Sequence, residues 1–204
     1  MILASHNSWS YAKPKKWYMR PFRFLARCQD KDIISQYLEG ARMFDLRLYF
    51  DKYGRMSVRH GMMAFDVPFN HLMNDLAFLE KKSHEERIYV RVILEQNFEK
   101  NDPKKQEQIQ WYFRVFCSNL QDHFQHIFFV GGVRKFDWKY IFTFPTSTPP
   151  MKDLYSSTTS MFGNKNKWHA KLDDWWPWLY AHLHNKKNIE RNLGFNGYLM
   201  IDFI

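Results

Sequence analysis

The sequence of 204 residues is short of cysteine and glycine and contains no long apolar run. Its two cysteines, Cys28 and Cys117, have neither the density of a disulfide scaffold nor the spacing of a zinc site, and they fit a reducing or an oxidising compartment equally well. No stretch approaches the ~18 apolar residues that a membrane-spanning helix requires. Internal repeats and low-complexity tracts are also missing. These absences exclude a disulfide-rich miniprotein, a transmembrane bundle and a repeat array.

Aromatic residues and positive charge are both abundant. Phe, Tyr and Trp make up 19% of the chain, and 30 Lys and Arg stand against 21 Asp and Glu, for a formal net charge of +9. This balance favours an anionic partner such as nucleic acid, an anionic membrane or a phosphate-bearing substrate, although surplus charge also serves solubility alone. With 45% hydrophobic and 25% charged residues the composition is that of a folded protein. The length predicts a single domain over residues 1–204.

The first residues do not have the pattern of a secretion signal. MILASHNSWSY lacks a basic start followed by an apolar stretch. We therefore expect no signal peptide in this sequence. The compartment stays open: the protein is secreted if a leader has been removed, and otherwise cytoplasmic or peripheral to a membrane.

Apolar patterning predicts strands separated by helices or long loops. The predicted helices are residues 32–39, 69–82, 103–120 and 168–185, the last one broken or kinked at Pro177. The predicted strands are residues 1–5, 41–50, 56–59, 87–94, 126–130, 139–144 and 198–204, with an eighth near 155–161. Strands that alternate with helices are typical of parallel β/α folds. We expect an α/β protein, a small, distorted (β/α)8 TIM-like barrel with reduced helices, because the chain falls short of the usual ~250 residues.

Polar residues gather at the ends of the early strands. His6 and Asn7 follow the first strand, and His60 ends the third. Asp45 and Arg47 lie two residues apart on the second strand and so point the same way. Two imidazoles and a guanidinium that meet at the carboxyl ends of barrel strands suit phosphoryl transfer, with one histidine as base, the other as acid and the arginine on the phosphate. Taken singly, each histidine could equally be structural, and Asp45 with Arg47 an ordinary buried ion pair.

Several linked motifs resemble a known family. SHNSWSY at 5–11, Cys28-Gln29, LEGARMFDLRLY at 38–49 and RHG at 59–61 resemble, in order and spacing, the catalytic X domain of bacterial-type phosphatidylinositol-specific phospholipase C. The resemblance extends over residues 1 to about 97 and returns at MIDFI, residues 200–204. It implies a TIM-like barrel. It also implies a lyase that cleaves phosphatidylinositol, or a related phospholipid, to diacylglycerol and cyclic inositol phosphate.

The resemblance implies roles for five residues. His6 would be the general base that deprotonates the inositol 2-hydroxyl, and His60 the general acid that protonates the leaving diacylglycerol oxygen. Arg47 would stabilise the charge on pentavalent phosphorus in place of a metal, while Asp45 would hold its hydrogen-bonding partners. Asp202 would orient the general base. An aspartate inside an apolar terminal strand needs a partner in any case.

Two departures from the bacterial pattern bear on a metal. Asn7 and Glu95 resemble the calcium-dependent eukaryotic branch, and together with Asp45 they offer oxygen ligands that suit calcium. Arg47, however, replaces a carboxylate which that branch also needs, and a fixed positive charge opposes a divalent cation. We therefore favour a site without a metal or other cofactor. The alternative is Ca²⁺ bound by Asn7, Asp45 and Glu95.

Substrate recognition is less well marked than the chemistry. Arg134 or Lys135 could contact the substrate, as the basic residue of that strand does in relatives, or be solvated. Bacterial relatives hold and stack on the inositol ring with a Gln-Asp-x-Tyr segment. We place the corresponding region at residues 155–168, where YSSTTSMFGNKNKW lacks that segment.

Residues 11–27 combine six Lys or Arg with five aromatic residues and no acid. Trp17, which follows three lysines, resembles a membrane-inserting tryptophan of bacterial relatives. Aromatic side chains favour the headgroup zone, and each basic residue adds ~1 kcal/mol at anionic lipid. The alternative is a basic surface loop with some aromatics packed inward. For the cluster WWPW at 175–178 we expect core packing, with a second interfacial patch as the alternative.

The sequence thus predicts an enzyme of lipid metabolism, a monomer that binds a phospholipid substrate and transiently contacts the membrane surface. A glycerophosphodiester phosphodiesterase-like hydrolase is the alternative enzyme. Such enzymes have a Glu-x-Asp metal site, and Arg47 stands in place of one of its acids. A catalytically inactive lipid-binding relative is a third reading, which the loss of a histidine would have supported. A nucleic-acid binder would carry a recognised binding motif, and none is found.

Overall fold

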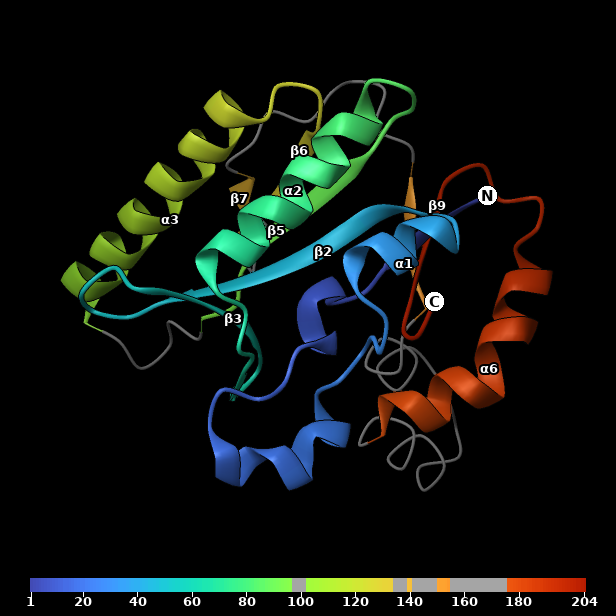
Figure 1. Ribbon diagram of the computed structural model, residues 1–204, viewed down its shortest axis with the longest axis horizontal. Coiled ribbons are helices and arrows are strands. Elements are labelled where there is room, and N and C mark those ends of the chain that lie inside the picture. The colour runs from blue at the N-terminus through green and yellow to red at the C-terminus, as the bar shows by residue number, and fades with distance from the viewer. Residues whose placement is uncertain (97–101, 134–138, 141–149, 155–175) are drawn as a thin grey trace.

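The computed structural model describes residues 1–96, 102–133, 139–140, 150–154 and 176–204 (Figure 1). Its strands are β1 (Ile2–Ser5), β2 (Ala41–Phe50), β3 (Met56–His60), β4 (Met63–Ala64), β5 (Tyr89–Leu94), β6 (Phe128–Val133), β7 (Lys139–Tyr140), β8 (Met151–Asp153) and β9 (Tyr198–Ile201). Its 3-10 helices are η1 (Ser8–Tyr11) and η2 (Trp17–Leu25), and its α-helices are α1 (Ile33–Leu38), α2 (Phe69–Ser83), α3 (Pro103–His123) and α6 (Pro177–Arg191). In these described parts of the chain, no helix is long and apolar enough to cross a membrane.

The strands form one curled sheet that makes a TIM-like half-barrel with few helices. Its order is β7-β6-β5-β2-β1-β9-β8, and every pair from β6 to β8 is parallel. Such a sheet brings the carboxyl ends of β1, β2, β5 and β9 to the same edge, which is where ligands bind in parallel α/β folds. The predicted fold class is therefore confirmed.

The β2 strand lies at the centre of this sheet. It spans Ala41–Phe50, as predicted, and eight of its ten residues are buried. A strand that is covered on both faces consists almost entirely of apolar residues. Polar residues within it do not serve solubility and are candidates for a functional role. Asp45 and Arg47 are such residues, and both are buried.

The helices α1, α2 and α3 cover the outer face of the sheet, and α6 lies beside β9 (Figure 1). Buried residues recur every three or four positions on α2 (Leu72, Leu76, Leu79) and on α3 (Ile109, Phe113, Cys117, Leu120). This spacing places each set along one helix face, and that face supplies the core contact with β2 and β5. The predicted positions of these helices are confirmed to within a few residues.

Two predictions about elements need correction, and one short strand was missed. The β3 strand is antiparallel to β2, because the turn at Gly54, with φ of 78°, sends the chain straight back as a hairpin. The helix expected at 168–185 begins, in its described part, at Pro177 and runs to Arg191. An N–H in the first turn of a helix has no partner within the helix, so proline loses nothing there by lacking one. Pro177 therefore begins this helix and does not kink it. The short strand β8 was not predicted, and the strand expected near 155–161 lies outside the described residues.

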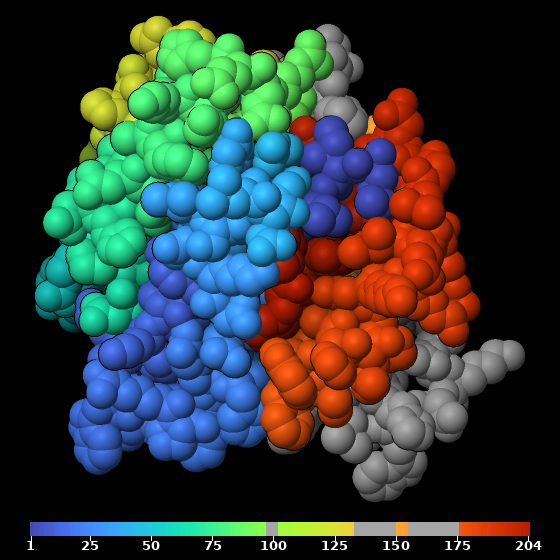
Figure 2. Space-filling view, turned by 45° about the vertical axis from the view of Figure 1, so that its right-hand side comes forward, coloured from blue at the N-terminus to red at the C-terminus, as the bar shows by residue number. Residues whose placement is uncertain are grey.

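Aromatic side chains are exposed on η2 and at the start of α6. No residue of η2 is buried, and the Trp17 side chain is 76% exposed. Trp176 and Trp178 are 41% and 39% exposed, so the expected core packing of this cluster is wrong for these two residues. The η2 segment and the start of α6 lie next to each other along one edge of the molecule (Figure 2), where the rings of Phe24 and Trp176 are 5.6 Å apart.

Candidate active site

His6 directly follows β1, and Asp202 directly follows β9. These two strands are parallel neighbours in register, with Ser5 opposite Ile201, so the residues that follow them lie side by side. The His6 N–H continues the ladder by donating to the carbonyl of Ile201 over 3.0 Å. Nδ1 of His6 lies 2.5 Å from Oδ1 of Asp202, and both residues are buried. Strand pairing alone therefore sets the imidazole against the carboxylate.

Arg47 approaches the same imidazole from β2. Its Nη2 lies 2.6 Å from Nε2 of His6, and its Nε donates to Oδ2 of Asp45 over 2.7 Å. A guanidinium can only donate, so Nε2 of His6 must be the acceptor. The proton of the neutral ring is then on Nδ1, where it donates to Asp202. This tautomer presents a lone pair at Nε2, as a general base requires.

Asp45 is fully buried and remains ionised. Burial alone would raise the pKa of this carboxyl, but the positive charges of Arg47 and Arg91 and a hydrogen bond from the Asn7 N–H together lower it below its usual value. Arg91, on β5, lies directly opposite Asp45 in the strand register and also reaches Asp153 on β8, with Nη1 3.8 Å from Oδ1. A row of alternating charges thus crosses the inner face of the sheet.

His60 reaches the site from the hairpin, although β3 is antiparallel to the strands that carry the other residues. Its ring centre lies 5.5 Å from that of His6, with the two planes nearly perpendicular. Nδ1 of His60 donates to the carbonyl of Ala26 over 2.9 Å and lies 3.5 Å from Sγ of Cys28. His60 is partly exposed whereas His6 is buried, so the two imidazoles occupy different environments.

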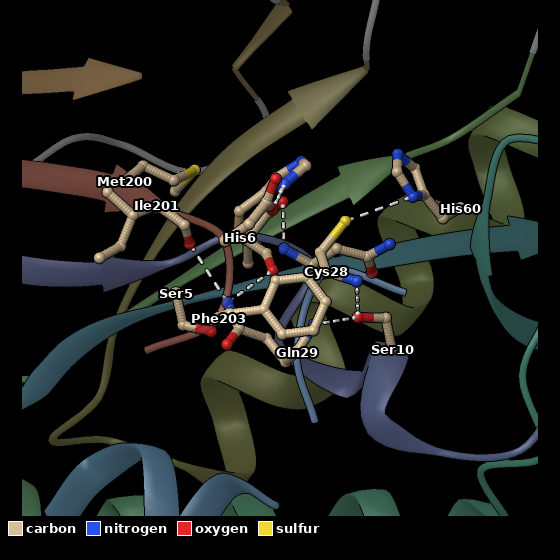
Figure 3. Close-up of polar contacts among 12 residues, drawn as sticks. Ser5, His6, Ser10, Cys28, Gln29, His60, Met200, Ile201 and Phe203 are labelled. Carbon is tan, nitrogen blue, oxygen red and sulfur yellow. Dashed lines mark hydrogen bonds and ion pairs between the residues drawn. The ribbon is translucent and has the colours of Figure 1, made fainter. Parts of the chain in front are cut away.

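The Cys28-Gln29 pair braces this arrangement. The Gln29 amide donates to the carbonyls of His6 and Ile201, at 3.2 Å each, and so bridges the ends of β1 and β9 (Figure 3). The backbone N–H groups of Cys28 and Gln29 both donate to Oγ of Ser10. Burial and the charge of the nearby Asp202 carboxylate raise the pKa of the Cys28 thiol, which therefore stays protonated.

The residues that could hold calcium are already engaged by a cation. Nε of Arg47 lies 2.7 Å from Oδ2 of Asp45, and its Nη1 lies 3.6 Å from Oε2 of Glu95. The guanidinium thus contacts both carboxylates that would bind Ca²⁺, and its charge repels a second cation. The side-chain amide of Asn7 is buried without a hydrogen-bond partner, but it offers a calcium ion only one neutral oxygen. This geometry does not fit a calcium ion.

A softer metal would meet the same difficulty. One ligand atom each from His6, Cys28 and His60 lies within 4.8 Å of the others. Both nitrogens of His6 and Nδ1 of His60 are already in hydrogen bonds, however, and Arg47 contacts His6. A metal would have to displace these contacts against the charge of Arg47.

The structure brings together His6, Asp45, Arg47, His60 and Asp202, all of which the sequence had singled out. Arg134 and Lys135 lie outside the described residues, and Trp17 lies on η2 rather than among the catalytic candidates. Sequence analysis missed Asp153. A signal was available, because MKDLY at 151–155 contains an Asp-x-Tyr pattern without the preceding Gln. Tyr155 itself lies outside the described residues.

Fold and site define a class: a TIM-barrel-like α/β protein in which three parallel strands and one antiparallel hairpin strand bring together two histidines, an arginine and two aspartates. Solved structures with this fold include phosphatidylinositol-specific phospholipase C from Listeria monocytogenes, with a TM-score of 0.62, 18% identity and coverage of 99% of this chain and 87% of that one. A second is the phosphatidylinositol-specific phospholipase C of S. aureus, with a TM-score of 0.64, 15% identity and coverage of 99% and 85%. No family model and no curated protein matches the sequence. The resemblance inferred from the motifs is therefore confirmed as a likeness of fold over nearly the whole chain.

Proposed function

We propose that this protein is a phospholipase C-like phosphodiester lyase that cleaves phosphatidylinositol, or a related inositol phospholipid, to diacylglycerol and a cyclic inositol phosphate. The observation that carries the proposal is the clamped, neutral His6, with Asp202 at 2.5 Å on one side, Arg47 at 2.6 Å on the other and His60 facing it. The fold shared with bacterial phosphatidylinositol-specific phospholipases C supports it.

His6 acts as the base. Its Nε2 accepts the proton of the substrate hydroxyl next to the phosphate, and the resulting alkoxide attacks phosphorus. The imidazolium that forms is stabilised by the Asp202 carboxylate, which already holds Nδ1–H. Because the nucleophile belongs to the substrate, attack closes a cyclic phosphodiester without any covalent link to the protein.

Arg47 neutralises charge on the phosphate. Two of its nitrogens contact His6 and Asp45, so the guanidinium is aligned before substrate arrives. The planar guanidinium can donate two parallel hydrogen bonds to the oxygens of a phosphodiester. These hydrogen bonds become stronger as negative charge develops in the transition state. Asp45 holds the guanidinium of Arg47 in this orientation. A fixed positive charge beside the phosphate favours catalysis without a metal.

His60 acts as the acid. The carbonyl of Ala26 accepts a hydrogen bond from Nδ1, so the other ring nitrogen, Nε2, is the one that can deliver a proton to the substrate. His60 protonates the diacylglycerol oxygen as the phosphorus–oxygen bond breaks. The partial exposure of this side chain suits a leaving group that departs towards the lipid surface.

The polyol is recognised on the inner face of the sheet beyond Arg47. Asp153 can accept hydrogen bonds from ring hydroxyls, and Arg91 holds its carboxylate. Arg134 and Lys135 remain candidates for further contacts. Asp153 lies one strand beyond β9, on the same parallel sheet as the base and Arg47.

The η2 segment is the membrane contact. Its exposed apolar side chains, Trp17, Tyr18, Phe22, Phe24 and Leu25, are interspersed with Lys and Arg. Trp176 and Trp178 extend this aromatic surface onto the start of α6. Aromatic rings insert at the headgroup level, and basic residues are attracted to anionic lipid.

Phosphorus NMR with phosphatidylinositol micelles tests the proposal. A cyclic phosphodiester resonance that grows in EDTA is expected, since Arg47 does the work of a metal. A resonance that needs added calcium would reassign Asn7, Asp45 and Glu95 as ligands. A phosphomonoester formed directly would indicate a glycerophosphodiesterase-like hydrolase, and no product in either condition would overturn the lyase assignment.

A further inference from the structure

A second group of metal-ligand residues lies away from the candidate active site. Glu80 and His84 are four residues apart at the end of α2, and His126 precedes β6. One ligand atom from each lies within 4.8 Å of the others. The loop after α2 leads into the start of β5, whereas the catalytic candidates cluster towards the carboxyl ends of the strands. The cluster is therefore separate from the lyase site and independent of its proposed function.

Glu80 is fixed in place. Its carboxylate accepts hydrogen bonds from the backbone N–H groups of Gln125, His126 and Ile127, at 3.0 to 3.2 Å. It also accepts one from Nδ1 of His126 over 2.8 Å. Partial burial would raise the pKa of this carboxyl, but the hydrogen bonds together lower it. The carboxylate is thus ionised and held rigidly, so a ligand atom of the cluster is preorganised.

Two imidazoles lie beside that carboxylate. The ring centres of His84 and His126 are 3.8 Å apart, with the planes tilted by 39°. Both side chains are exposed, so a hydrated ion can reach them without any opening of the fold. Protonation of both rings would place two like charges in contact. A divalent cation shared by the neutral rings would take the place of the His126 Nδ1–H beside the Glu80 carboxylate, without that repulsion.

We propose that Glu80, His84 and His126 form a binding site for a divalent transition-metal ion of the Zn²⁺ class. Zinc takes imidazole nitrogen and carboxylate oxygen at about 2.0–2.2 Å, commonly from three protein side chains with water in a fourth position. Imidazole ligands select such ions over Ca²⁺ and Mg²⁺. Closing the ligand set requires only rotation of the exposed His84 ring and transfer of the His126 proton from Nδ1 to Nε2 or to solvent. The bound ion links the end of α2 to the start of β6.

Calorimetric titration of the EDTA-treated, dialysed protein with Zn²⁺ tests the site. One ion per chain is expected to bind, and Ca²⁺ is expected not to. The H84Q and H126Q variants should each bind Zn²⁺ at least about ten-fold more weakly. Loss of a residue that only supports a metal ligand already lowers metal affinity by about that factor, and loss of the ligand itself should lower it at least as much. Zn²⁺ at a hundred times its Kd should raise the Tm of the wild type by ~5–10 °C and of these variants much less.

Two control variants make the result specific. H182Q removes an exposed imidazole on α6, which belongs to neither metal-ligand cluster, and should bind Zn²⁺ like the wild type. C28A removes the thiol of the His6, Cys28 and His60 cluster. Zn²⁺ binding that survives in both H84Q and H126Q, or that is lost in C28A instead, would overturn the assignment. Equal Tm values in EDTA would show that H84Q and H126Q are folded.

Discussion

At the scale of single residues, the protonation state of His6 is set by its two neighbours. Arg47 can only donate and Asp202 as a carboxylate can only accept, so the imidazole between them has its proton on Nδ1. In the proposed mechanism the tautomer of this base is set before substrate binds, and the substrate hydroxyl replaces the Arg47 N–H at Nε2. The chemistry of the site therefore rests on two contacts that come from different strands.

Loss of either histidine should remove turnover. Positioned acid–base groups contribute about 10²–10⁴-fold each, so H6A and H60A should each lower kcat by at least a hundred-fold on phosphatidylinositol micelles. Circular dichroism should show the wild-type fold in H60A, because His60 is partly exposed. H123A, at the exposed end of α3, is the matched control and should keep full activity. Retained activity in H6A or H60A would refute the two-histidine mechanism.

In the proposed mechanism Asp202 positions His6, and a variant of Asp202 should change kcat without changing KM. In D202N the amide can donate to Nδ1 of His6, which favours the tautomer with its proton on Nε2, where Arg47 also donates. We expect kcat to fall by about 10²–10⁴-fold with KM nearly unchanged. Steady-state kinetics on a soluble inositol phosphodiester would measure both. An unchanged kcat would mean that Asp202 has only a structural role.

At the scale of elements, η2 is the clearest departure from ordinary packing. It has nine residues, none buried, and it includes Pro21. An element that buries nothing of itself gains little from folding alone. Its apolar side chains are expected to find their partner at a lipid surface.

W17A should weaken vesicle binding and leave the chemistry intact. Trp17 is 76% exposed, so its removal costs little stability but deletes a ring from the proposed membrane contact. Sedimentation with anionic vesicles should show the loss, while cleavage of a soluble inositol phosphodiester should be unchanged. The matched control is W111A on α3, also well exposed at 59%, which should bind vesicles normally. An equal loss of cleavage on soluble and vesicle substrates would make Trp17 structural.

Two glycines with positive φ differ in what surrounds them. Gly131 on β6 has φ of 113°, and an added Cβ would lie 2.4 Å from the carbonyl oxygen of Val92. Gly40, with φ of 101°, has open space at that position. G131A combines backbone strain with a clash against the neighbouring strand, whereas G40A carries the strain alone, about 1–2 kcal/mol. Urea denaturation should find G131A the less stable by at least ~1 kcal/mol; the reverse order would contradict the paired register of β5 and β6.

At the scale of the whole molecule, acid should destabilise the fold. The pKa values of Asp45, Asp51, Glu80 and Glu86 are lowered because hydrogen bonds and nearby positive charges outweigh the effect of burial. Each such group contributes stability above its unfolded pKa, about 4, and loses it as the pH falls further. Asp75 acts in the opposite direction, since burial raises its pKa. Among the described residues, four carboxyls with lowered pKa values stand against one with a raised pKa, so we expect net destabilisation in acid.

Scanning calorimetry between pH 7 and pH 3 would measure this dependence. The Tm should change little down to about pH 5 and fall below it. E80Q removes one of the four groups, so its Tm at pH 7 should be lower and its decline in acid shallower. A Tm that rises on acidification would mean that Asp75 dominates.

What the sequence determined by itself is local. The bounds of β2, the apolar faces of α2 and α3, and the identities of His6, Asp45, Arg47 and His60 could be predicted. Alternation and helical spacing are properties of neighbouring residues, and the motifs lie within the first 61 positions. Asp202 was predicted as well, but only through the family resemblance.

Only the tertiary structure decided which distant residues meet. It paired β1 with β9, so that His6 and Asp202 touch across 196 positions. It also turned β3 antiparallel, put Asp153 beside Arg91, left Trp176 exposed, and joined His126 to the end of α2. Strand partners and burial depend on long-range packing of the whole chain, and no local pattern in the sequence encodes them. Periodicity says which face of an element is apolar, and only the assembled fold says what lies against it.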